Sequence, residues 1–252
     1  MSQTEKEDKL ILSRAEDAIY IAERSYQIKT VGFLNPHQRS LIAKNVYLNK
    51  DINVYFIGGD EDAERRVMIC CPQFVDINID EIINVIRIKG RDVGKLNHRD
   101  YLGSLMGLGI TRENIGDILC AEDGAFVFVK KDIASFIMQN LEKIGRHGVK
   151  TELCSCSEAE LPKPKLKEIS GTVSSIRLDA VLSLGIGVSR AKAAELINSG
   201  LISLNFEVCE SVSEKVNEGD LISARGYGRM RLQQVGGLTR KKRIGITVVR
   251  FE

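Results

Sequence analysis

Cysteines, histidines and one Arg-Leu-Asp triplet are the residues of this sequence that could take part in chemistry. The six cysteines are Cys70, Cys71, Cys120, Cys154, Cys156 and Cys209. Cys154 and Cys156 could supply half of a zinc site, but zinc usually needs four ligands and His147 is the nearest histidine. We therefore expect no metal site. Six scattered thiols in 252 residues indicate a reducing compartment rather than a disulfide framework.

Catalytic arrangements are weak throughout the chain. His37 and His98 follow expected helix starts and have no triad companions in view. The glycines of Gly185-Ile186-Gly187 lie between two expected helices, whereas a nucleotide-binding turn follows a strand. For Asp179 we expect a structural role, as the ion-pair partner of a nearby arginine such as Arg190. The sequence thus predicts no catalytic residue, no cofactor and no small-molecule substrate.

Charge is distributed unevenly along the chain. The net charge of +2 combines residues 161–252, with 15 basic against 9 acidic side chains, and residues 1–160, with 21 against 25. Eight basic residues and no acidic one lie between Arg225 and Arg250. A basic C-terminal third favours a polyanionic partner, most often a nucleic acid. No apolar run is long enough to span a bilayer and the N-terminus is polar, so we expect a cytoplasmic protein without a membrane contact.

The N-terminal part, residues 1–76, is expected to be a small α+β domain. Apolar residues at helical spacing predict a first helix: Ile11, Ala15, Ala18, Ile19, Ala22 and Tyr26. Asn35 followed by Pro36 predicts the start of a second helix. Two apolar runs, 52–57 and 67–71, predict a hairpin with a long loop.

The middle part, residues 77–154, reads as βαββαβ, the order of ferredoxin-like plaits. Strands are expected at 82–88, 115–120, 125–129 and 148–153, and helices after Asn97 and over 131–144. RNA-recognition modules use this plait, but so do many enzymes. Phe126 and Phe128 share one strand face, where they either stack on RNA or lie in the core, and the core is favoured.

A lysine- and proline-containing segment, 155–170, is expected to be a linker to a third domain, 171–252. In that domain Ser174 or Ser175 is expected to cap a helix that ends at Gly185. Ser189 is expected to cap a second helix, which Gly200 ends. Short strands are expected at 201–204, 207–209, 221–225 and 246–251, with a flexible basic loop around Tyr227.

This third domain resembles the RNA-binding domain first described in ribosomal small-subunit protein S-four. The resemblance is carried by Arg177-Leu178-Asp179, Ser189-Arg190, Ala194, Leu196-Ile197, Gly200, Asn205 and Gly219-Asp220. Upstream, Gly58-Gly59, Ala63-Glu64-Arg65 and the run GLGITRENIGDIL from Gly107 to Leu119 resemble the bacterial YlmH family of ribosome-associated proteins. The resemblance implies three small α+β domains: an N-terminal α/β domain, a plait-like RNA-binding middle domain and the S-four-type C-terminal domain.

The resemblance also implies binding of ribosomal RNA on the large ribosomal subunit, on stalled subunits that carry peptidyl-tRNA. The residues that fall on the helix-turn-helix and adjoining strand of the module are Arg177, Ser189, Arg190, Lys192 and Asn205. Further basic residues are expected to extend this surface: Arg225, Arg229, Arg231, Arg240, Lys241, Lys242 and Arg243. The alternative is an RNA-modifying enzyme, of the pseudouridine synthase or methyltransferase type, that carries the same module.

Overall fold

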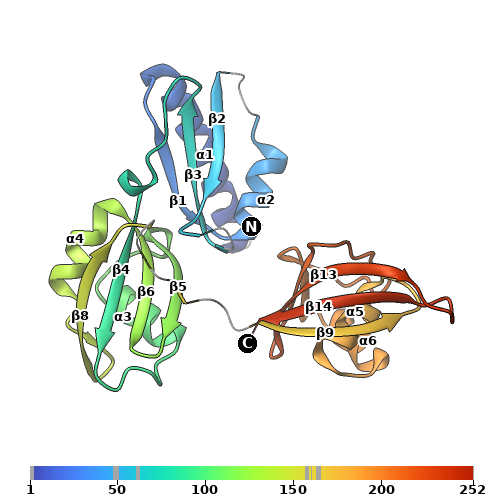
Figure 1. Cartoon of the computed structure of the whole chain (residues 1–252). Helices are drawn as coiled ribbons and strands as arrows, with labels where there is room; N and C mark the ends of the chain where they lie inside the picture. Colours follow the sequence, from blue (N-terminus) through green and yellow to red (C-terminus); the bar gives the residue numbers. More distant parts are fainter. Residues whose placement is uncertain are drawn as a thin grey trace. The chain divides into compact units, whose positions relative to one another are not determined.

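The computed structural model divides into two compact units, residues 1–162 and residues 163–252. It describes residues 3–47, 51–60, 63–156, 159, 161–162 and 166–251. Each unit combines helices with a sheet (Figure 1), which confirms the α+β class predicted from the sequence. Pro164 of the predicted linker lies outside the described residues.

The first unit begins with two helices, α1 (Gln3–Ser25) and α2 (Pro36–Asn45). The expected stripe on α1 is buried at Ile11, Ala15, Ala18, Ile19 and Ala22. Tyr26, expected in the same stripe, is 67% exposed, because the helix ends before it and its φ of 53° turns the chain. Helix α2 begins as predicted: Asn35 and Gln38 form a capping box with two hydrogen bonds of 2.9 Å.

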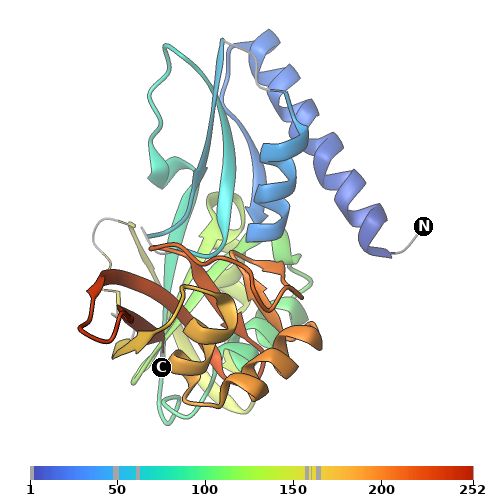
Figure 2. The ribbon, with the colours of Figure 1, turned by 90° about the vertical axis from the view of Figure 1, so that its right-hand side faces the viewer.

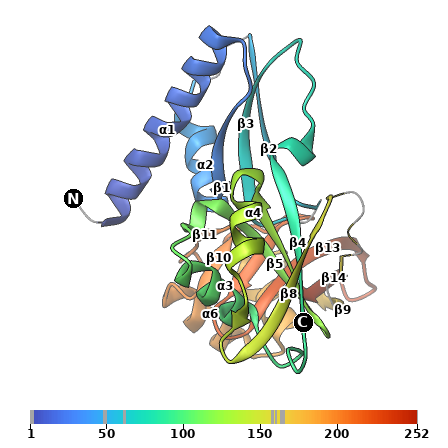
Figure 3. The same cartoon turned by 90° about the vertical axis from the view of Figure 1, so that its left-hand side faces the viewer.

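Three strands, β1 (Lys29–Leu34), β2 (Ile52–Ile57) and β3 (Arg66–Pro72), form an antiparallel sheet in the order β1-β3-β2. The predicted hairpin is present as β2 and β3. Strand β1 was not predicted, because it follows α1 closely and no turn residues mark its start. Both helices lie on one face of this sheet (Figure 2 and Figure 3) and pack with Cys70 in one core. Burial raises the pKa of the Cys70 thiol to about 12.

The rest of the first unit has the predicted βαββαβ order. Its elements are β4 (Ile83–Gly90), α3 (His98–Gly107), β5 (Ile115–Ala121), β6 (Gly124–Lys130), α4 (Lys131–Asn140) and β8 (His147–Cys154), with 3₁₀ turns at Ile79–Glu81 and Arg112–Asn114. With the short strand β7 (Lys143–Ile144), the strand order β5-β6-β4-β8-β7 is fully antiparallel, as in the split plait. Helix α4 is shorter than the helix expected over 131–144, because the chain enters the short strand β7 (Lys143–Ile144).

The two faces of the plait sheet pack against different partners. Helices α3 and α4 cover one face. On the other face, Phe33 and Ile69 of the N-terminal sheet share a core with Val85 and Phe128. Phe126 and Phe128 are 8% and 1% exposed, so the core interpretation of these two rings is correct. The domain boundary near residue 76 stays a prediction, and one hydrophobic core crosses it.

Arg65 and Asp117 join the N-terminal sheet to the plait. The Asp117 carboxylate accepts hydrogen bonds from the backbone N–H groups of Glu64 (2.6 Å) and Arg65 (3.1 Å). The Arg65 guanidinium donates to the carbonyl oxygens of Phe33 (2.5 Å) and Ile115 (3.2 Å). Burial lowers the pKa of Arg65 to about 10 and raises that of Asp117. Two of the upstream motifs that carry the family resemblance, Ala63-Glu64-Arg65 and the run from Gly107 to Leu119, therefore meet at this joint.

The second unit is one sheet with two helices packed on one face (Figure 1). Its elements are β9 (Leu166–Val173), α5 (Leu178–Ile186), α6 (Arg190–Asn198), β10 (Ile202–Leu204), β11 (Glu207–Val208), β12 (Leu221–Ala224), β13 (Gly228–Leu238) and β14 (Ile244–Phe251). The strand order is β11-β10-β12-β13-β14-β9. Leu178 and Val181 of α5 lie in the same core as Met230 and Val248 of the sheet.

Four local predictions for this unit are wrong. The predicted linker ends too late, because Leu166–Ser170 belong to β9 and pair with β14. The first helix is capped at neither Ser174 nor Ser175: its N-cap residue is Arg177. It ends at Gly187, whose φ of 70° is left-handed, rather than at Gly185. Strand β13 also occupies part of what was expected to be loop, since pairing with β12 and β14 outweighs its glycine-rich sequence.

Candidate nucleic-acid interface

A buried carboxylate organises the start of the two helices in the second unit. Asp179 is 5% exposed and forms ion pairs with Arg177 (3.2 Å) and Arg190. The predicted pairing of Asp179 with Arg190 is therefore confirmed. Both arginines keep about half of their side chains in solvent, at 41% and 50% exposure. Asp179 thus fixes two guanidinium groups side by side at the surface, where they can bind phosphate oxygens.

Ser189 and Lys192 lie at the start of α6, next to this cluster. The Ser189 hydroxyl accepts a hydrogen bond from the backbone N–H of Lys192 at 3.2 Å, which confirms the predicted cap. The Lys192 ammonium contacts Glu195 at 2.7 Å, and the hydrogen bond to Glu195 raises the pKa of Lys192. The Ser189 side chain is engaged in the helix cap, so a phosphate at this point would meet mainly the basic side chains.

Tyr227 is a surface residue of this region that the sequence placed only in a flexible loop. The turn between β12 and β13 carries Tyr227 between two glycines with left-handed φ values of 88° and 94°. Tyr227 is 41% exposed. Arg225 starts this turn and is held by its backbone N–H to the carbonyl of Leu201 at 3.0 Å. In the sequence, the two glycines that flank Tyr227 are the signal that predicts an ordered turn here.

Asn205 has structural contacts in this domain. Asn205 and Phe206 form the two-residue turn between β10 and β11, with φ values of 48° and 73°. The Asn205 amide donates to Asp220 at 2.8 Å, and its carbonyl oxygen accepts from the backbone N–H of Leu221 at 3.0 Å. Asn205 therefore ties this turn to the Gly219-Asp220 turn. Its predicted role in binding RNA stays a prediction.

The remaining predicted residues lie on other parts of the sheet. Met230 and Leu232 of β13 face the helices, so the alternating Arg229 and Arg231 face the opposite side. Both guanidinium groups lie 5.6 Å from the Phe251 ring. The other basic residues lie at the β13–β14 hairpin, at Arg240, Lys241, Lys242 and Arg243. The basic residues expected to form one surface therefore lie in three places.

Comparison with known proteins places this chain in a family. Residues 74–158 match the family model described as "Putative RNA-binding domain in YlmH", and residues 176–222 match the S4 domain. The chain is 31% identical over 247 residues to the Ribosome-associated protein quality control protein P2 of Bacillus subtilis, covering 97% of this chain and 96% of that protein. The chain belongs to the YlmH family. The expected family and its S-four-type module are both confirmed.

A solved structure agrees with this membership. The cell division protein YlmH from Streptococcus pneumoniae matches with a TM-score of 0.50 at 25% identity, over 62% of this chain and 94% of that one. Within the described part of this YlmH-family chain, no cluster of three or more His, Cys, Asp or Glu side chains could hold a metal ion. The helices in the same ranges include none with the length and apolar character to cross a membrane.

Replacing Asp179 by alanine should destabilise the second unit and disperse its two arginines. Arg177 and Arg190 are half exposed, so solvent screening limits the loss of unfolding free energy to about 1–2 kcal/mol. Hydrogen exchange of α5 and α6, measured by mass spectrometry on the full chain, should become faster. D179N keeps one acceptor oxygen and should show a smaller effect. Equal hydrogen exchange in the wild type and both variants would show that the contacts of Asp179 with Arg177 and Arg190 do not stabilise these helices.

Proposed function

We propose that this chain is a non-catalytic, cytoplasmic RNA-binding protein that associates with ribosomal RNA on the large ribosomal subunit, on stalled subunits that carry peptidyl-tRNA. The observation that carries the proposal is the surface around Asp179, in the S4 domain of a chain that is similar along its whole length to a ribosome-associated quality control protein. The proposed RNA-binding surface consists of Arg177, Arg190, Lys192, Arg225 and Tyr227.

The chemistry of this surface suits structured RNA. The major groove of an A-form helix is too deep and narrow for side chains, so proteins contact its backbone and shape. Arg177 and Arg190 are held in place by one carboxylate, which reduces the entropy lost when they bind a phosphate. Tyr227 adds an exposed ring in the same domain, on which a nucleotide could stack. The surface can therefore bind RNA without reading base edges.

The contacts of Asp179 favour a binding role over the alternative of an RNA-modifying enzyme. A catalytic aspartate must reach its substrate, whereas Asp179 is 5% exposed and both of its oxygens are engaged by arginines. An enzyme would alter nucleosides of ribosomal RNA. Mass spectrometry of ribosomal RNA from cells with and without the gene should find identical nucleosides, and a modification that depends on the gene would establish the enzyme instead.

Co-sedimentation tests the proposed partner. Full-length protein is mixed with purified large subunits that either carry peptidyl-tRNA or are empty, and the bound fraction is measured. We expect tighter binding to subunits with peptidyl-tRNA. Equal binding to both would contradict the stalled-subunit assignment, and binding to neither would overturn the ribosomal role altogether.

A further inference from the structure

The plait differs from an RNA-recognition module in what covers its sheet. Such modules stack bases on exposed aromatic residues of the two central strands. Here the central strands are β4 and β6, and the rings of Phe126 and Phe128 on β6 are buried. A Cβ atom at Gly59 would lie 1.9 Å from the Phe128 ring, so the backbone at Gly59 packs directly on that ring. Neither phenylalanine can stack on an unpaired base.

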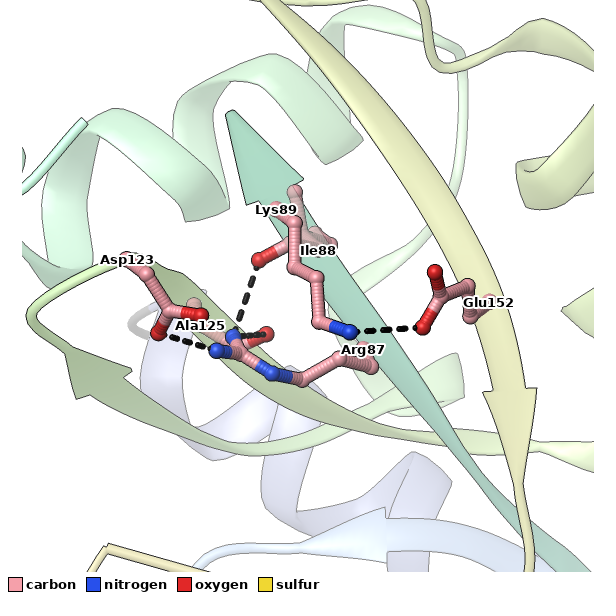
Figure 4. Close-up of polar contacts among 6 residues, drawn as sticks. All are labelled: Arg87, Ile88, Lys89, Asp123, Ala125 and Glu152. Carbon is pink, nitrogen blue, oxygen red and sulfur yellow. Dashed lines mark hydrogen bonds and ion pairs between the residues drawn. The ribbon is translucent and has the colours of Figure 1, made fainter. Parts of the chain in front are cut away.

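The other end of the same sheet face is polar and open. Lys89 of β4 lies opposite Lys150 of β8, and Arg87 lies opposite Glu152. Lys89, Lys150 and Glu152 are all exposed. Figure 4 shows Lys89 reaching across to Glu152, at 2.9 Å, while Arg87 extends in the other direction toward Asp123. The covered and open parts therefore belong to one continuous sheet face.

Arg87 is a buried cation of β4, two residues before Lys89. It is 7% exposed and lies 4.3 Å over the Phe126 ring. Its guanidinium donates to the carbonyl oxygens of Ile88 (3.0 Å) and Ala125 (3.2 Å) and pairs with Asp123 (Figure 4). The hydrogen bond from Arg87 holds the pKa of Asp123 below its ordinary value. Arg87 is thus a buried side chain whose charge is paired with Asp123. The exposed surface at this end of the sheet is formed by Lys89, Lys150 and Glu152.

These surface residues have an unfavourable charge pattern for a free protein. Two lysines directly opposite each other on neighbouring strands repel, and Lys89 and Lys150 are such a pair. Arg91 follows β4 and Arg146 lies in the β7–β8 turn, both exposed and at the same end of the sheet. Apart from the buried Arg87, segments 87–91 and 146–152 together contain four basic residues and one acidic residue, within a region of net charge −4. An external polyanion would offset this repulsion.

We propose that Lys89, Arg91, Arg146 and Lys150, the β4–β8 patch, bind the phosphate backbone of double-stranded RNA. This inference rests on the proposed function that the chain binds RNA, and it adds a second contact surface in the first unit. Duplex RNA is the occupant because the patch consists of cations, and the Phe126 ring against which Arg87 packs is buried. Unpaired RNA is held mainly by stacking, whereas a duplex is held through its phosphates and shape.

The test measures how tightly the full chain binds a 20-base-pair RNA duplex over a range of KCl concentrations. The variant is K89Q/K150Q, and the matched control is K9Q/K44Q, which removes two exposed charges elsewhere in the same unit. Loss of two phosphate contacts should raise the Kd roughly 5- to 20-fold at about 0.1 M KCl and reduce the salt slope by about 1 to 2. The control should change neither quantity.

The outcomes separate this inference from the proposed function. Suppose that the wild type binds the duplex and that R190E/K192E weakens this binding. If K89Q/K150Q then leaves the Kd and its salt dependence unchanged, the β4–β8 patch does not bind RNA. If K89Q/K150Q weakens binding of single-stranded RNA more than of the duplex, the assignment to duplex RNA is wrong. If the wild type binds neither RNA nor large subunits, the proposed function fails and this inference fails with it.

Discussion

Replacing Arg190 and Lys192 by glutamate should weaken binding to large ribosomal subunits about 100-fold at about 0.1 M salt. Both side chains lie at the start of α6 and are exposed, so they can each neutralise a phosphate. Reversing their charges removes two attractive contacts and adds two repulsive ones. Because each lost phosphate contact also lowers counterion release, the dependence of the Kd on salt should become shallower by about 2. Co-sedimentation at several salt concentrations measures both quantities.

Two further proteins make this prediction decisive. Arg190 pairs with the buried Asp179, so a glutamate at position 190 could disturb the fold; R190Q/K192Q avoids a second carboxylate and should still lose about 10-fold. K9E/K44E makes the same change in net charge as R190E/K192E, but on the first unit, and should bind like the wild type. If the glutamine variant binds as well as the wild type at every salt concentration, the surface around Asp179 does not contact RNA.

Replacing Arg65 by alanine should cost the first unit about 3 kcal/mol of unfolding free energy. Arg65 hydrogen-bonds the carbonyl oxygens of Phe33 and Ile115, so its loss removes a charged donor from both sides of the joint; Arg112 still donates to Ile115. Arg65→Lys should also destabilise, because an ammonium cannot form the forked contacts of a guanidinium. Thiol alkylation of Cys70 in increasing urea, followed by mass spectrometry, reports this unfolding, since the native thiol is buried and its pKa is raised.

Arg14 provides the matched control for Arg65. Its guanidinium pairs with Glu113 at 2.5 Å, but both side chains are nearly half exposed, so R14A should cost less than about 1 kcal/mol. If R65A and R14A shift the urea midpoint of Cys70 alkylation equally, the joint between the N-terminal sheet and the plait does not depend on Arg65.

Local sequence signals determined the features that depend on a few neighbouring residues. Asn35-Pro36 and Ser189 fix the starts of two helices, because a side-chain acceptor satisfies the first N–H groups of the helix. The periodicity of apolar residues gave the order of elements in the plait, since one face of each element must be buried. The pairing of Asp179 with Arg190 followed for a similar reason, as a carboxylate on an apolar helix needs a nearby cation.

Only the tertiary structure decided which surfaces are open. The burial of Phe126 and Phe128 depends on strands from residues 29–72, and the opposite placement of Arg229 depends on which side of β13 packs on the helices. Strands β1 and β13 have weak local signals and are stabilised by pairing with distant partners. The sequence by itself therefore determined the family, the modules and the basic C-terminal third. The structure decided which basic side chains share a face, because that depends on contacts between residues far apart in the chain.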